Sequence, residues 1–246
     1  KKRIEKKAQD IRNKIKDILI KSNWSYGDAE KIANFNIFDQ TAKADWFDPI
    51  WMFGLDDGFD IVIGNPPYVR QEKIKPIKTL LKKQGYKVFS STADLYVYFY
   101  EKGYNLLKDN GVFCYITSNK WMRAKYGENL RKFLKKNTTL LKLVDFGGYR
   151  VFAQTVDTCI VEFLKEKPNK EHEFLYAIVP SDIENPIAYI KENLKSMKQQ
   201  KLSDNAWTLA EEKVLALKEK IERIGKPLKD WNVKIYRGIL TGYNKA

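Results

Sequence analysis

The sequence is poor in the residue types that build metal sites and disulfide frameworks. Its 246 residues include one histidine, His172, and two cysteines, Cys114 and Cys159. Without a cluster of Cys or His ligands, a zinc site is not expected, and we predict no bound metal. Both cysteines lie in apolar, strand-like runs, which indicates buried free thiols, a disulfide between them being the alternative. His172 lies in a polar turn, which we interpret as a surface position.

Long apolar runs and phosphate-binding glycine loops are also missing. No apolar run approaches the roughly 20 residues that a membrane-spanning helix needs, and the chain begins without a signal-peptide pattern. We therefore expect a cytoplasmic location and no membrane partner. The sequence contains no Gly-x-Gly and no P-loop, which excludes a dinucleotide-binding glycine loop within it. We find no convincing Asp…Glu-x-Lys arrangement of the nuclease type either.

Negative charge is scarce relative to positive charge. The 45 Lys and Arg residues against 31 Asp and Glu residues give a net charge of +14. A polyanionic partner is one inference, because phosphate contacts supply most non-specific affinity for nucleic acid. A lysine-rich solvated surface explains the same charge equally well, and several lysines do fall in helical runs, namely Lys78, Lys82, Lys83, Lys132, Lys135 and Lys136.

The most informative segment present is residues 59–68, Phe-Asp-Ile-Val-Ile-Gly-Asn-Pro-Pro-Tyr. The apolar run 61–63 predicts a short buried strand. Gly64 ends that strand, and the two prolines prevent its continuation because proline has no N–H for a sheet ladder. In open α/β sheets, ligands bind at the carboxyl ends of strands. The segment that follows Gly64 is therefore a candidate binding site.

The four residues after that strand suit a planar ligand that carries an amino group. The Asn65 side-chain oxygen and the Pro66 carbonyl are both hydrogen-bond acceptors. Pro67 keeps the turn rigid, and Tyr68 offers a flat ring for stacking.

The spacing of apolar residues predicts an α/β fold. We expect helices over 3–20, 26–33, 72–83, 94–108 and 126–137, and further strands over 112–117, 140–146 and 156–164. This alternation favours a largely parallel sheet whose last pair, joined by a short connection, is antiparallel. Farther along we expect a strand at 174–179, a polar segment with a central helix at 184–204, an amphipathic helix at 211–224 and a strand at 233–239.

Asn65-Pro66-Pro67-Tyr68 resembles the motif of amino-methyltransferases that use S-adenosylmethionine. An ordered series of further segments resembles type IIG restriction–modification enzymes, which fuse a nuclease, a DNA adenine methyltransferase and a target-recognition domain. These segments are residues 35–39, 45–49, 51–54, 59–69 and 236–244. An ordered series is more specific than one short motif.

This resemblance implies a fold and a domain organisation. We expect a partial Rossmann-like class I methyltransferase sheet, later strands only, over residues 1–166, a mostly helical connector over 167–229, and the start of a recognition domain over 230–246. In this family the cofactor's glycine loop and its ribose-gripping acid lie upstream of the first helix. The resemblance thus implies an excised or cleaved piece, inactive alone, whose open sheet edge at 60–64 is covered by the missing half or by a second copy.

The resemblance also implies roles for individual residues. Asn65 and the Pro66 carbonyl would accept hydrogen bonds from the exocyclic amine of adenine and so free its lone pair. The base must first be flipped out of the duplex, and Tyr68 would stack on it together with Phe152, which lies within 150–155. The alternatives are that Tyr68 is a turn residue that covers the core and that Phe152 is a hydrophobic loop anchor.

Basic residues near the motif are the candidate contacts to double-stranded DNA. These are Arg70, Lys73, Lys120, Arg123 and Arg237, although ordinary helix-entry polarity explains most of them almost as well. The favoured function is a site-specific DNA adenine-N6 methyltransferase that takes its methyl group from S-adenosylmethionine, in a protein that can also carry an endonuclease. The alternatives are a methyltransferase acting on RNA or on protein glutamine, and a non-catalytic DNA-binding piece.

Overall fold

A computed structural model describes residues 2–36, 39, 41, 49–153 and 156–233. The chain divides into two compact units, residues 1–56 and residues 57–246. This division does not test the domain boundaries expected at residues 166 and 229, which stay predictions. The strand expected at 233–239 and the candidate DNA contact Arg237 lie outside the described residues, as do parts of the segments 35–39 and 45–49.

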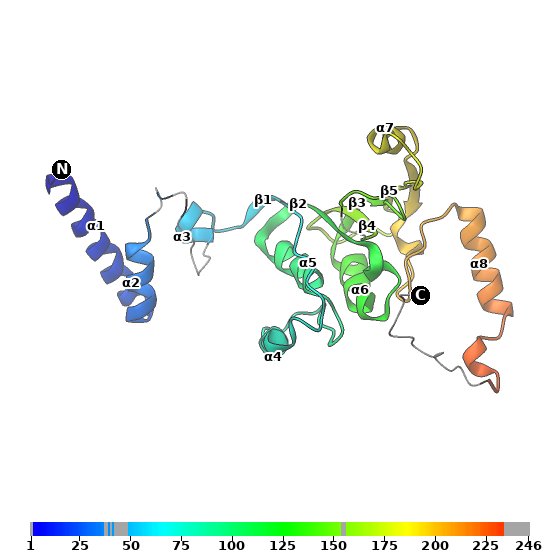
Figure 1. Ribbon diagram of the computed structural model, residues 1–246, viewed down its shortest axis with the longest axis horizontal. Coiled ribbons are helices and arrows are strands. Elements are labelled where there is room, and N and C mark those ends of the chain that lie inside the picture. The colour runs from blue at the N-terminus through cyan, green and yellow to red at the C-terminus, as the bar shows by residue number, and fades with distance from the viewer. Residues whose placement is uncertain (1, 37–38, 40, 42–48, 154–155, 234–246) are drawn as a thin grey trace, which may run out of the picture. The chain divides into compact units, whose positions relative to one another are not determined.

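The first unit is built on a pair of helices, α1 (Lys2–Lys21) and α2 (Tyr26–Asn34), followed by α3 (Pro49–Phe53) (Figure 1, blue to cyan). The Ser25 hydroxyl accepts a hydrogen bond from the Asp28 backbone N–H at 3.1 Å and so caps α2. Leu19 packs with Ala29 and Ile32, and the partly buried Ile15 packs against this cluster. Ile4, Ile11 and Ile18 of α1 are exposed.

The second unit contains one six-stranded sheet in the order β1-β2-β4-β3-β5-β6. The first two strands are parallel, whereas β4 runs antiparallel to both of its neighbours, β2 and β3. The expected α/β fold with an antiparallel last pair is therefore confirmed. The expectation of a largely parallel sheet is wrong, because β1–β2 and β3–β5 are parallel whereas β2–β4, β3–β4 and β5–β6 are antiparallel. The strands are β1 (Phe59–Gly64), β2 (Leu107–Ser118), β3 (Thr139–Asp145), β4 (Thr158–Leu164), β5 (Glu173–Ile178) and β6 (Lys195–Lys198).

The helices of this unit cover the sheet unequally. The main core lies between the sheet and the helices α5 and α6, where Tyr100, Leu134, Phe113 and Phe163 are fully buried. A smaller cluster on other residues of β3 and β4 includes Ile190 of α7. The helices are α4 (Lys75–Lys83), α5 (Leu95–Leu106), α6 (Glu128–Asn137), α7 (Pro186–Glu192) and α8 (Glu212–Ile224), with 3-10 turns at Asn119–Met122, Lys125–Gly127, Gln199–Lys201 and Leu228–Asp230 (Figure 1).

Two elements differ from the sequence prediction. The helix expected to reach residue 108 ends at Leu106, because the next residue already pairs with Phe59 of β1. Strand β6 was not predicted, since its sequence Lys-Ser-Met-Lys has a single apolar residue. With β5, which runs parallel to β3, it adds two strands to the sheet within the segment 167–229 that was expected to be mostly helical. That segment also carries α7 and α8.

Strand β1 lies at one edge of the sheet. Its Val62 side chain packs against the main core, whereas Ile61 and Ile63 are 62% and 76% exposed. The strand expected at residues 60–64 is therefore an edge strand, and the expectation that the run 61–63 is buried is wrong for Ile61 and Ile63.

The two cysteines and the single histidine lie in ordinary structural positions. Both cysteines are free thiols, as expected, with Cys159 buried and Cys114 half-buried. His172 is not a free surface side chain, because its ring is half-buried and Nε2 lies 2.6 Å from the Leu140 carbonyl oxygen. Within the described ranges, no helix is long and apolar enough to cross a membrane, and no group of three or more His, Cys, Asp or Glu side chains could hold a metal ion.

Candidate functional site

The Asn-Pro-Pro-Tyr segment follows β1 directly and is tied to the start of α5. The Val69 carbonyl oxygen accepts a hydrogen bond from the Leu95 backbone N–H at 2.9 Å. The Asp94 carboxylate, just before α5, accepts another from the Gln71 backbone N–H at 2.8 Å. These bonds hold the residues that follow Tyr68, while the Asn65 side chain stays exposed.

Tyr68 is half-buried and anchored to the neighbouring strand. Its hydroxyl donates a hydrogen bond to the Ile116 carbonyl oxygen at 3.3 Å, and its ring meets Tyr96 edge to face with centroids 6.3 Å apart. Burial, helped by the nearby Cys159 thiol, raises the pKa of Tyr68 to about 12. The phenol is therefore neutral near pH 7, and its ring is fixed in orientation.

The structure brings three of the predicted site residues into one pocket. Asn65, Tyr68 and Phe152 line a hollow of about 350 Å³ together with Ala153 and Val156. Phe152 lies in the connection between β3 and β4, far from the motif in sequence. A hollow of this size, apolar on most sides with one amide, is of the kind that accepts a small planar ligand. Tyr68 also contacts the core, so the structure is compatible with both of its expected roles.

The turn after β2 lies on the same edge of the sheet as the motif, because β1 and β2 are parallel. Its Trp121 is fully buried and contacts Tyr100 and Trp207 with ring centroids 5.7 and 5.0 Å apart. Trp121 is thus a core residue, whereas Lys120 beside it is exposed. Of the other predicted DNA contacts, Arg70 and Lys73 are exposed as well.

Asp145 is a buried carboxylate that the sequence analysis did not single out. It ends β3 and is 2% exposed. Its oxygens accept hydrogen bonds from Asn119 Nδ2 at 2.7 Å, from the Gly147 backbone N–H at 3.0 Å and from Arg123 Nη2 at 3.1 Å. The Arg123 side chain is 66% exposed, so this predicted DNA contact is held at one end by a buried charge. In the sequence, only its place at the carboxyl end of a strand marks Asp145.

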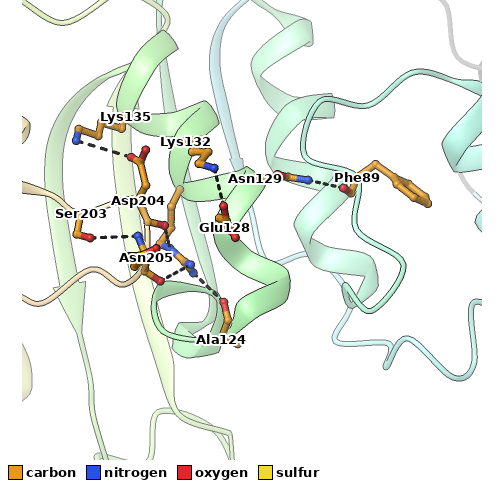
Figure 2. Close-up of polar contacts among 10 residues, drawn as sticks. Phe89, Ala124, Glu128, Asn129, Lys132, Lys135, Ser203, Asp204 and Asn205 are labelled. Atoms are coloured by element: carbon orange, nitrogen blue, oxygen red, sulfur yellow. Dashed lines mark hydrogen bonds and ion pairs between the residues drawn. The ribbon is translucent and has the colours of Figure 1, made fainter. Parts of the chain in front are cut away.

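Arg131 of α6 is a second buried charge that the sequence did not reveal. It donates hydrogen bonds to four backbone carbonyls, those of Trp121, Ala124, Asp204 and Asn205. Burial lowers the pKa of Arg131. Figure 2 shows Ala124, Asp204 and Asn205 converging around these bonds. Arg131 thereby fastens the turn after β2 to the segment that precedes α8.

A larger hollow lies near the opposite ends of the strands, where β3 begins and β4 ends. It measures about 570 Å³ and is lined mainly by lysines and amides, namely Lys132, Lys135, Lys136, Lys167, Pro168, Asn169, Gln199, Gln200 and Asp204. Two of these lysines are already in ion pairs, Lys132 with Glu128 and Lys135 with Asp204 (Figure 2). Their charge is partly neutralised, so this hollow fits a solvated surface.

Comparison with known proteins places these residues in a family. Residues 2–152 match the family described as Eco57I restriction-modification methylase. The type II restriction enzyme and methyltransferase RM.Eco57I of Escherichia coli is 36% identical over 112 residues, which cover 44% of this chain and 11% of that protein. The type II methyltransferase M.XhoI of Xanthomonas vasicola is 29% identical over 211 residues, which cover 78% of this chain and 38% of that protein.

Among solved structures, a type I restriction-modification system methyltransferase subunit from Streptococcus thermophilus is similar with a TM-score of 0.43 and 18% identity. The match covers 59% of this chain and 33% of that one. The chain thus spans less than half the length of the relatives it matches. The family match extends over more than half of the chain, includes the Asn-Pro-Pro-Tyr segment and ends at Phe152. The chain belongs to the Eco57I restriction-modification methylase family, which agrees with the observed α/β sheet.

Proposed function

We propose that this chain is the catalytic-motif portion of a restriction–modification DNA methyltransferase that transfers a methyl group to N6 of adenine. One observation carries the proposal: Asn65, Tyr68 and Phe152 share a pocket at the carboxyl edge of the sheet. Family membership supports the methyltransferase class. The pocket suits an aromatic amine, and the choice of adenine as target follows the resemblance of the Asn-Pro-Pro-Tyr segment to DNA adenine methyltransferases.

The pocket suits an aromatic amine that must be made nucleophilic. The lone pair of an exocyclic amine is delocalised into its ring, which makes the nitrogen a poor nucleophile. Two acceptors outside the ring plane, the Asn65 side-chain oxygen and the Pro66 carbonyl, would draw the amine hydrogens out of plane and localise the lone pair. Pro66 is buried and is not among the residues that line the pocket. The placement of both acceptors counts because methyl transfer needs reacting atoms held about 3–3.5 Å apart.

The two aromatic residues suit capture of a flipped base. A base inside duplex DNA must leave the stack before its amine can react. Stacking of the base on Tyr68 and Phe152 would compensate for the stacking given up in the duplex, since a base–aromatic contact contributes roughly 1–3 kcal/mol. The hydrogen bond from Tyr68 to Ile116 keeps one of the two rings in place before the base arrives.

S-adenosylmethionine would supply the methyl group as an electrophilic sulfonium when bound. The described residues fit only the target side of that reaction. The pocket lining contains no carboxylate that could grip a ribose, and the sequence contains no Gly-x-Gly loop. We therefore predict that the chain alone binds S-adenosylmethionine poorly. Calorimetry that finds low-micromolar affinity for this chain would contradict that prediction.

The partner in this proposal is double-stranded DNA. Arg70, Lys73, Lys120 and Arg123 all expose basic groups, and they follow strands that end at the edge where the pocket lies. Exposed basic side chains there could contact phosphates on either side of a flipped base. The chain alone is expected to bind duplex DNA weakly, without sequence preference, and less tightly as salt increases.

Transfer of a tritiated methyl group by the full-length protein tests the proposal. Label is expected in duplex DNA, at N6-methyladenine after digestion to nucleosides. Label in RNA or on the glutamine amide of a peptide would favour the other acceptor classes, because a glutamine amide is also a planar nitrogen. Label that survives an Asn65→Ala substitution would remove the central role of the motif.

A further inference from the structure

We propose that Asn119 and Asp145 act as positioning residues that hold Phe152 in place for base capture. The hydrogen bond between their side chains is called the Asn119–Asp145 clamp. The inference rests on the proposed function, because it assigns these buried residues a role in forming the target-base pocket. Neither side chain lines the pocket itself.

Asn119 ties together the two ends of the connection that carries Phe152. Its side-chain Nδ2 donates to Asp145, the last residue of β3, at 2.7 Å. Its backbone N–H donates to the carbonyl oxygen of Asp157, the residue before β4, at 3.0 Å. One residue that follows β2 thus spans both stems of the connection.

Asp145 extends the clamp in two further directions. One carboxylate oxygen also accepts the N–H of Gly147, which has a φ of +49° and lies just inside the connection. The other oxygen accepts from Arg123. The carboxylate therefore joins the turn after β2, the first residues of the connection and one predicted DNA contact. With three donors around it, this buried charge is well satisfied, and charge-assisted bonds of this kind are strong.

Burial makes the clamp costly to break. Asn119 is 4% exposed and Asp145 is 2% exposed, so water cannot readily replace a missing partner. The clamp also lies where the regular sheet pairing stops, since the β2–β4 ladder ends at the pair Ser118 and Thr158. Beyond that pair, the backbone bond from Asn119 to Asp157 and the side-chain bonds of the clamp direct the chain. A shift of about 1 Å in a residue that positions a reacting group can cost roughly a hundredfold in rate.

The fluorescence of a single-stranded DNA oligonucleotide that carries one 2-aminopurine tests how this chain positions Phe152. Single-stranded DNA removes the cost of unpairing the base. The limiting fluorescence at saturation reports the stacking of the 2-aminopurine, whereas anisotropy of an end-labelled oligonucleotide reports affinity through phosphates. Phe152→Ala is expected to abolish the fluorescence change, and Asn119→Ala to remove most of it. Anisotropy affinity should stay within about twofold, because phosphate contacts supply it.

A conservative substitution of Asp145 tests whether its hydrogen bonds or its negative charge hold Phe152 in place. Asp145→Asn keeps an amide oxygen for Asn119 and Gly147, so it should retain most of the fluorescence change, whereas Asp145→Ala should remove it. Gln199→Ala is the matched control. This buried amide donates to the Thr138 and Lys135 carbonyls and accepts from the Leu140 N–H, at the other end of β3. The control should lower stability to urea without changing the fluorescence.

The outcomes distinguish the inference from the function on which it rests. If Phe152→Ala leaves the fluorescence unchanged, Phe152 does not stack on the base, and both the two-ring pocket of the proposed function and the clamp's role fail. If Phe152→Ala changes the fluorescence but Asn119→Ala does not, the clamp alone is refuted. An equal change in the Gln199→Ala variant would also refute it, because the effect would then follow stability. Should Asn119→Ala not fold, Asn119→Ser removes the same side-chain arm and keeps a polar atom at the buried position.

Discussion

The sheet has a carboxyl edge, where β1 and β2 end, and an amino edge, where these strands begin. The two differ in how their polar groups are held. At the carboxyl edge, a pocket of about 350 Å³ carries two aromatic rings, and buried polar residues such as Asn119 and Asp145 lie behind it with their partners. At the amino edge, the hollow is larger, about 570 Å³, and is lined by solvated lysines. Size and charge favour the second hollow, whereas the Asn65 amide and the two aromatic rings favour the first. Chemistry that needs exact placement depends on groups held in place, so the smaller pocket is the better candidate.

The largest expected effect separates these two edges by activity. In the full-length protein, Asn65→Ala removes an acceptor that, in the proposed function, is used mainly in the transition state. By analogy with the removal of one oxyanion donor, kcat should fall roughly 10²–10³-fold, with DNA affinity nearly unchanged. Lys136→Ala at the amino edge is the matched control and should leave kcat unchanged. Equal losses of kcat and of DNA affinity in the Asn65 variant would indicate a structural role.

A second prediction compares the edge strand with the strands inside the sheet. Among the strands that the structure describes, β1 pairs with β2 alone and lies at the edge of the sheet, and two of its apolar side chains, Ile61 and Ile63, are exposed. Such an edge is a template for pairing with another chain. We expect the purified chain to form a dimer or a swapped assembly, or to bind a fragment that carries the missing half of the domain. Light scattering tests this: a stable monomer whose amides at 60–64 exchange rapidly would show that the free edge is tolerated.

The sequence was sufficient to predict the parts of the fold that follow simple periodicity. The apolar spacing of 3–20 predicted α1, and the run 61–63 predicted β1 at its proper place before the motif. Strand β6 was missed because pairing with β5, and not its own composition, makes it a strand. Long-range pairing of this kind leaves little trace in a single sequence.

The candidate site was predictable only where a short motif carried it. Asn65 to Tyr68 were found from the strand and the two prolines, and Phe152 was found from the family resemblance. Asp145 and Arg131 were missed, because a lone Asp or Arg in a sequence is most often a surface residue. Their significance depends on three or four partners contributed by distant segments, such as Asn119 for Asp145 and Asn205 for Arg131.

A third prediction compares how substitutions at the two edges change the salt dependence of DNA binding. Removing one side chain that binds a phosphate should lower the slope of log K against log salt concentration by about 1. When the isolated chain binds duplex DNA, Arg123→Gln should lower the slope by that amount if the carboxyl edge contacts the DNA phosphates. Lys167→Gln, at the amino edge, should leave it unchanged. A change for Lys167 without one for Arg123 would move the DNA to the other edge.

The smallest expected effect concerns the two thiols and alkaline pH. Burial raises the pKa of Cys159 from 9.0 to about 12, while Cys114 is only half-buried. Because the folded-state pKa is raised, the stability that Cys159 contributes is fully present below pH 9 and is lost as the pH rises through about 12. Tyr68, whose pKa is raised from 10.0 to about 12, adds to that loss above pH 10.

At about pH 8 the Cys159 thiol should therefore react with a thiol reagent only as fast as the protein unfolds, whereas Cys114 should react in the folded state. A Cys114→Ser variant isolates the slow reaction, and urea should accelerate it in step with unfolding measured by circular dichroism. Rapid reaction of Cys159 in the native protein would mean that the core behind Tyr68 opens readily. The pocket could not then hold its aromatic ring in the fixed orientation on which the comparison of the two edges depends.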